Sequence, residues 1–172
     1  MARAPMETID ELVDFLTEQH DQLESLLPQV LQAGGAERAR LWRQVRQTLA
    51  VHEALEQETV HPAAGQLTDA AQTPRIEEEG EAEGAIAGLE RVDPDSEEFA
   101  KGFDELQGDI VDHAEHEESE EFHQLSGELT PVARERVAVA LELFARADEG
   151  TLDGATFEEM LAGAKERIRA AG

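Results

Sequence analysis

The chain has 172 residues, of which 40 are Asp or Glu and 14 are Lys or Arg, so its formal net charge is −26. This acidity excludes nucleic acids and anionic membrane surfaces as partners, because binding to either depends on Lys and Arg. The absence of cysteine excludes disulfides, thiolate metal sites and a cysteine nucleophile. No apolar run is long enough to span a membrane and the N-terminus lacks a signal-peptide core, so we expect a cytoplasmic protein.

The N-terminal part of the chain predicts two long helices. A Thr-x-x-Glu capping box at Thr8 starts the first helix. Pro28 is expected to kink or end this helix, and Gly34-Gly35 closes the segment. Apolar residues at helical spacing predict the second helix over 36–62. Residues 62–73 are rich in Pro, Ala, Gly, Thr, Asp and Gln, and we expect them to form a loop.

Four further helices are predicted after this loop. Pro74 fits the first turn of a third helix, which ends near residue 93. A fourth helix runs over 95–125, and two shorter ones follow over 130–150 and 156–168.

These elements predict an all-α fold, and the lack of tyrosine and the single tryptophan agree with a chain poor in strand-forming residues. Short connections favour an antiparallel up-down four-helix bundle over 8–125. Residues 126–172 are expected to form a C-terminal two-helix extension that packs on the bundle and covers one exposed edge.

Three of the predicted bundle helices place a histidine on their apolar face. Residues three, four or seven positions apart share one face of a helix, which puts His20, His52 and His113 among inward leucines, valines and isoleucines. Glu56 follows His52 by four residues, and Glu117 follows His113 at the same spacing. Two helices therefore present an imidazole and a carboxylate one turn apart.

A single inward histidine is more often a hydrogen-bonded core residue than a ligand. Three histidines together with two buried glutamates favour a bound cation, since unpaired carboxylates in an apolar core are costly. Imidazole and carboxylate donors without thiolate suit Fe, Mn or Zn. Carboxylates that can bridge suggest two metals, as in bundle di-iron sites.

In the order and spacing of these motifs, residues from about 8 to 125 resemble the hemerythrin-like (HHE cation-binding) family. The resemblance rests on Thr17-Glu18-Gln19-His20-Asp21, on His52…Glu56…His61-Pro62 and on His113…Glu117…Phe122. It implies a centre of two non-haem irons joined by an oxo or hydroxo bridge. It also implies small ligands such as O₂, peroxide or NO.

The chain departs from the family pattern in the third helix. Family members usually carry a histidine early in that helix, whereas this chain has Glu79 at the expected position and Glu83 one turn later. Either a carboxylate replaces the imidazole, which we favour, or the site is degenerate and binds one metal or none. Replacement favours the ferric state and oxidase or peroxide chemistry, because oxygen donors are harder than imidazole.

The resemblance thus implies a ligand set in which Glu56 and Glu117 are the bridges. The complete set is His20, His52, Glu56, Glu79, His113 and Glu117.

The remaining histidines have less favourable positions. His61 is nine residues from His52, on the opposite side of an α-helix, so it reaches the site only if the helix is distorted before Pro62. His123 lies well off the face of His113, and we expect both His61 and His123 to be exposed or to contact ligands indirectly. His116 is closer to that face and suits a hydrogen bond to a metal ligand.

Three functions are consistent with these features. The first is a non-haem di-iron protein that binds O₂ or a related small ligand, for oxygen binding or for peroxide or nitric oxide handling. The second is a carboxylate-shifted di-iron oxidase or a catalase-like peroxidase. The third is a metal-free acidic interaction module with a degenerate site. We expect a monomer or a weak dimer.

Overall fold

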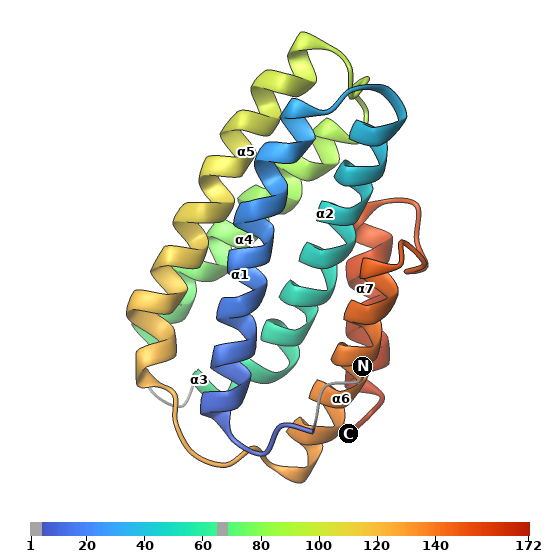
Figure 1. The fold of residues 1–172 in the computed structure, drawn as a ribbon. Coiled ribbons are helices and arrows are strands. Elements are labelled where there is room, and N and C mark those ends of the chain that lie inside the picture. The colour runs from blue at the N-terminus through green and yellow to red at the C-terminus, as the bar shows by residue number, and fades with distance from the viewer. Residues whose placement is uncertain (1–4, 65–68) are drawn as a thin grey trace.

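A computed structural model describes residues 5–64 and 69–172 of the chain. Within those ranges the only β pairing is an isolated bridge between Thr8 and Glu128, and the regular elements are helices. Figure 1 shows four long helices side by side, running alternately up and down, which confirms the predicted all-α up-down bundle. The four are α1 (Ile9–Gln32), α2 (Gly35–Leu55), α4 (Asp69–Leu89) and α5 (Glu97–His116).

Helices α2 and α5 both continue through a wider, π-helical turn. In each turn a backbone N–H bonds to the carbonyl five residues earlier: that of His61 to Glu56, and that of Phe122 to Glu117. The two distortions therefore begin at the two glutamates that sequence analysis singled out as bridges. The segments are η1 (Glu56–Val60) with α3 (His61–Ala64) after α2, and η2 (Glu117–Glu121) with the 3-10 turn η3 (Phe122–Gln124) after α5.

Local sequence explains where the helices begin. The capping box at the start of α1 is present: Thr8 Oγ1 accepts a hydrogen bond from the Glu11 N–H, and the Glu11 carboxylate accepts one from the Thr8 N–H. Ser96 caps α5 and Thr130 caps α6 through their hydroxyl oxygens, which satisfy backbone donors that have no partner inside the helix.

Two expectations based on proline are wrong: that Pro28 could end the first helix, and that a helix starts at Pro74. Helix α1 does not end at Pro28 but continues to Gln32. Of the residues 62–73 expected to form a loop, 62–64 lie in α3 and 69–73 in α4, while 65–68 lie outside the described residues. Pro74 is consequently inside α4 and not at its start. The φ of a proline is compatible with a helix, although inside one it removes a backbone donor and crowds the carbonyl four residues earlier.

The C-terminal extension is a helical hairpin of α6 (Pro131–Asp148) and α7 (Phe157–Arg169). Helix α7 packs against α2 and α4, and α6 packs against α2 (Figure 1). The Phe144 ring contacts that of Phe15 in α1 edge-on, with 5.2 Å between centroids. The hairpin and the bundle therefore share one hydrophobic core.

Aromatic packing fills the half of the bundle next to the α1–α2 and α4–α5 connections. Trp42 lies edge-on to Phe99 and Phe103, at centroid distances of 5.7 and 5.6 Å, and the two phenylalanines are stacked. All three side chains are buried. Among the described residues, no helix combines the length and the apolar character needed to cross a membrane.

Replacing Ile168 by Ala should destabilise the whole chain and not only the hairpin. Ile168 is fully buried in α7, and deletion of such an aliphatic side chain typically costs about 2–5 kcal/mol. We expect one cooperative unfolding transition in denaturant, shifted by that amount. The control is Val132→Ala in α6, because Val132 is 44% exposed and should change stability little. A separate early transition in the Ile168→Ala variant would contradict a shared core.

Candidate metal centre

The structure brings the six predicted ligands together in one layer across the bundle. The layer lies where the α-helical parts of α2 and α5 give way to their π turns, and five of the six side chains are buried, with His113 half-buried. They come from four helices: His20 from α1, His52 and Glu56 from α2 and η1, Glu79 from α4, and His113 and Glu117 from α5 and η2.

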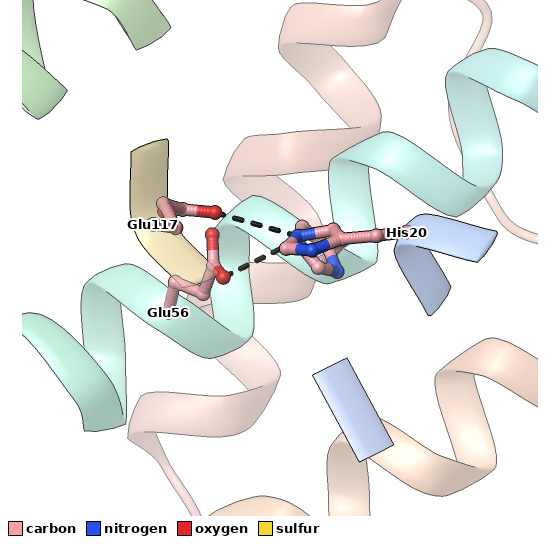
Figure 2. A group of neighbouring side chains, drawn as sticks. His20, Glu56 and Glu117 are labelled. Carbon is pink, nitrogen blue, oxygen red and sulfur yellow. Dashed lines mark hydrogen bonds and ion pairs between the residues drawn. The ribbon is translucent and has the colours of Figure 1, made fainter. Parts of the chain in front are cut away.

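The ligand atoms form two overlapping groups, and the atoms within each group all lie within 4.8 Å of one another. Both groups contain Glu56 and Glu117, whose residues are 0% exposed. Figure 2 shows these two carboxylates facing the imidazole of His20. The first group is His20, His52, Glu56 and Glu117, and the second is Glu56, Glu79, His113 and Glu117. The two groups thus share two carboxylates, and each group alone has the donors to hold a cation.

Three imidazoles direct Nε2 into the layer. The Nε2 atoms of His52 and His113 lie 3.2 Å from Glu56 Oε1 and Glu117 Oε1, respectively. His20 Nε2 lies 3.4 Å from Glu117 Oε2 and 3.0 Å from His52 Nε2. Nitrogen and oxygen donors from different helices therefore converge on a small volume.

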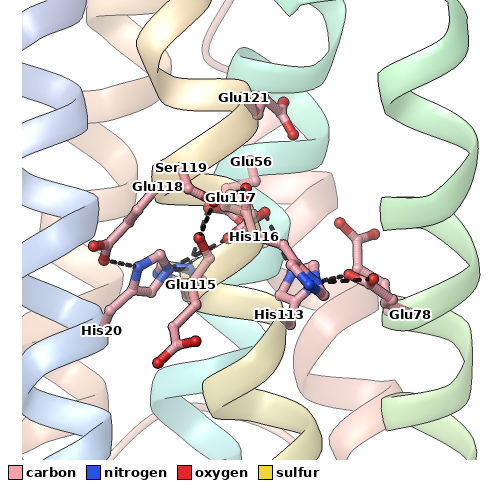
Figure 3. Close-up of polar contacts among 12 residues, drawn as sticks. His20, Glu56, Glu78, His113, Glu115, His116, Glu117, Glu118, Ser119 and Glu121 are labelled. Atoms are coloured by element: carbon pink, nitrogen blue, oxygen red, sulfur yellow. Dashed lines mark hydrogen bonds and ion pairs between the residues drawn. The ribbon is translucent and has the colours of Figure 1, made fainter.

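Carboxylates outside the layer fix two of the rings. His20 Nδ1 is 2.7 Å from Glu118 Oε1, and His113 Nδ1 is 2.9 Å from Glu78 Oε2. With the Nδ1 proton held by a carboxylate, Nε2 is left as the donor atom for a metal. Figure 3 shows both pairs, with exposed His116 also against Glu78, its Nδ1 3.2 Å from Oε1.

The carboxylates of the layer lack the partners that buried charges need. Within the described part of the chain, no oxygen of Glu56 or Glu117 accepts a hydrogen bond of good geometry, and Glu79 Oε1 accepts none. Nε2 of His113 is likewise unsatisfied in that part of the chain. Buried polar atoms without partners are rare in folded proteins and costly. A cation at each group would satisfy them, so the residues fit a metal site.

The pKa shifts of the metal-free centre come from burial and from the charges that lie close together in the layer. Burial raises the pKa of Glu56 well above its usual value, and nearby Glu117 adds to the effect. Burial also raises the pKa of Glu79 to about 7, although a hydrogen bond from Gln57 opposes this. Burial disfavours charge on His113, but Glu117, Glu56 and Glu78 outweigh it and raise its pKa to about 10. Without a metal, the layer therefore retains protons at neutral pH.

The C-terminal hairpin reaches the centre through Gln57. Lys165 Nζ in α7 donates to Gln57 Oε1 at 2.7 Å, and Gln57 Nε2 donates to Glu79 Oε2 at 2.7 Å. This chain of bonds holds one oxygen of Glu79 and leaves Oε1 for the layer. Sequence reasoning missed both Gln57 and Lys165, because neither spacing nor residue type marks a contact between α7 and the π turn.

The structure also distinguishes between the two carboxylates considered for the missing imidazole. Glu79 joins the second group, whereas Glu83 is only half-buried and lines a surface groove between α4 and α7. Glu53 is a further acidic residue that sequence reasoning overlooked. It is buried beside His52, and burial, together with Glu79 and Glu83, raises its pKa well above the usual value.

His61 is not exposed, in contrast to one of the expected alternatives. Its side chain is 12% exposed, and its Nε2 lies 3.4 Å from Glu79 Oε1. Together with Glu117 and Glu121 it forms a third group of ligand atoms within 4.8 Å of one another. His123, by comparison, is exposed as expected.

A small pocket adjoins the layer on the side of the aromatic core. Its volume is about 30 Å³, close to the volume of about 30 Å³ that one water molecule occupies in the liquid. The imidazoles of His20, His52 and His113 line it together with apolar side chains such as Leu23 and Ile110. A pocket of this size admits only a ligand of a few atoms.

Comparisons with known proteins agree with this geometry. A family model described as the hemerythrin HHE cation binding domain matches residues 11–125. Among solved structures, a hemerythrin HHE cation binding domain-containing protein from Mycobacterium kansasii is similar, with a TM-score of 0.61 over 92% of this chain and 94% of that chain. The two sequences are 18% identical, so this likeness concerns the fold alone. No curated protein matches the chain in sequence.

Cation affinity should fall steeply as the pH is lowered. A bound cation must displace the proton of His113, whose pKa is about 10, and below pH 7 also that of Glu79, whose pKa is about 7. Each displaced proton weakens binding by about tenfold per pH unit. Calorimetric titration of the metal-free protein with Mn²⁺ between pH 8 and 6 should therefore show at least a ~100-fold loss of affinity.

Glu79→Gln provides the control for this pH dependence. The variant lacks the carboxyl group that titrates near pH 7, so the extra steepening below that pH should disappear while the dependence due to His113 remains. An affinity of the wild-type protein that does not change with pH would contradict the assignment.

Proposed function

Because the chain belongs to the hemerythrin HHE cation binding domain family, we propose that its buried layer of histidines and glutamates binds two iron ions and, at them, a small ligand such as O₂, peroxide or NO. One observation carries this proposal: two groups of ligand atoms overlap in the fully buried carboxylates of Glu56 and Glu117. A single cation satisfies one group. Two cations would satisfy both groups and explain why both groups include the carboxylates of Glu56 and Glu117.

The donor types favour iron among the cations that the family binds. Each group combines imidazole nitrogen with carboxylate oxygen, and the chain has no cysteine to attract softer metals. Iron held by such donors supplies redox exchange with O₂, peroxide or NO. The 30 Å³ pocket beside the layer fits a ligand of that size and supports this ligand class.

The chain's own residues have three tasks in this function. Glu118 and Glu78 hold the rings of His20 and His113 so that Nε2 faces the layer. Gln57 fixes one oxygen of Glu79. Phe122 stacks on the His20 ring, with 5.9 Å between centroids and an interplanar angle of 5°, and covers the ring with apolar surface.

The decisive test is metal analysis combined with an absorption spectrum. Protein loaded with Fe²⁺ under anaerobic conditions and then desalted should retain two irons per chain, and the spectrum should change on adding O₂ or azide. His52→Asn and His113→Asn each remove an imidazole from a different group, so each variant should lose about half of the iron. His123→Asn is the control, because His123 is exposed.

Thermal unfolding gives the outcome that would contradict the proposal. Iron binding to the folded state must raise the melting temperature, because binding to one state stabilises that state. Metal-free protein whose melting temperature is unchanged by iron would leave only an acidic interaction module with a degenerate site.

A second candidate function, peroxide removal, is favoured by Glu79. A carboxylate in place of an imidazole makes the second group richer in hard oxygen donors, which favours ferric over ferrous iron. Disproportionation converts two H₂O₂ into two H₂O and one O₂, and it needs no external reductant.

Substitution of Glu79 by His tests this second candidate. In iron-loaded protein, Glu79→His should lower the rate of O₂ release from H₂O₂ by about 10-fold or more, since it restores a softer donor in the second group. Glu83→His adds a histidine one turn away and outside either group, so its rate should equal that of the wild type. Equal rates in all three proteins would exclude a role of the carboxylate in peroxide removal.

A further inference from the structure

The end of helix α2 contributes a histidine to the centre that regular helix geometry would place elsewhere. In an α-helix, His61 would lie on the side opposite to His52, nine residues earlier. The π turn η1 closes a hydrogen bond from the His61 N–H to the Glu56 carbonyl, five residues back. In a π-helix, the residue five positions on lies above the first. His61 therefore follows Glu56 along the same side of the helix, toward the layer.

The contacts of His61 show what it faces. Its Nε2 lies 3.4 Å from Glu79 Oε1 and 4.0 Å from Glu121 Oε1. A ring nitrogen of His61 also lies within 4.8 Å of a carboxylate oxygen of Glu117. The imidazole of His61 thus lies among three buried carboxylates. One comes from α4 and the other two from the first and last residues of η2.

The second π turn is necessary for the same arrangement. η2 begins at Glu117 and ends at Glu121, so the carboxylates of its first and last residues can both turn toward the interior at the level of His61. Figure 3 shows Glu121 next to the layer, on the helix that also carries His113 and Glu117. Distortions of this kind inside long helices are uncommon and are frequent at functional sites. Here two of them occur at the same level of the bundle.

An imidazole is also missing from the second group, where α4 contributes only Glu79. The first group contains two histidines and the second contains one. We propose that His61 is the second imidazole ligand of the cation at the Glu79 position, and that Glu121 binds to the same cation from the opposite helix. The proposal rests on the metal centre described under Proposed function. It extends the second position to His61, Glu79, His113 and Glu121, with Glu56 and Glu117 shared between the two positions.

The reason for the π turn follows from this assignment. A regular helix α4 could supply the second imidazole only from a histidine of its own, and α4 contains no histidine. The imidazole must then come from another helix that already approaches the position. Helix α2 does so through Glu56, and one extra residue in its turn is sufficient to bring His61 to the same place.

Titration of the metal-free protein with Co²⁺ tests this inference, because cobalt reports binding through its visible absorption without any enzymatic activity. We expect two equivalents per chain in the wild type. His61→Asn should weaken one of them by at least tenfold and leave the other unchanged. His113→Asn should weaken the same equivalent, and His52→Asn the other one. His123→Asn is the matched control, since it removes an exposed histidine close to Glu121 in sequence.

A second variant keeps the test decisive if His61→Asn does not fold, as judged by circular dichroism. Glu121→Gln has the same shape, and we expect it to weaken the same equivalent by at least threefold. If both variants bind cobalt as the wild type does while His113→Asn loses one equivalent, the role of His61 is overturned and the metal centre stands. Wild-type protein that binds no cobalt overturns both proposals.

Discussion

The structure depends on two fully buried carboxylates, Glu56 and Glu117, that face each other across the bundle with histidine nitrogens as their nearest partners. Burial of carboxylates whose oxygens accept no hydrogen bond of good geometry is costly. The protein partly offsets this cost by a proton on His113, whose pKa is about 10, and by the raised pKa values of Glu56 and Glu79. A bound cation removes the same cost, and the rest of the layer follows from that requirement.

The surrounding fold keeps these charges in place. On one side, Trp42, Phe99 and Phe103 fill the bundle with packed rings. On the other, the hairpin of α6 and α7 adds apolar surface to α2 and α4 and shares their core. Because packed elements lie on both sides, the histidines and glutamates have little freedom to move away from one another. The free-energy cost of placing them together therefore remains until a cation binds.

Regular helices explain which parts could be predicted from the sequence. The inward positions of His20, His52 and His113 can be predicted because each lies in a regular α-helix. The spacing of the apolar residues in that helix indicates which face points to the core. Prediction was poorer beyond Glu56 and Glu117, where the π turns change the period and bring His61 inward. The start of α4 was also misplaced, since Pro74 signals a first turn but lies within the helix. No local pattern could show Lys165, which reaches the centre only through tertiary packing.

The path from Lys165 through Gln57 to Glu79 links two regions that are distant in sequence. Because α7 orients the amide that holds Glu79, docking of the hairpin and occupation of the centre are expected to be coupled. Thermodynamic reciprocity requires that each favour the other by the same factor. The hairpin therefore influences the affinity of the centre for its ion, although it contributes no ligand atom.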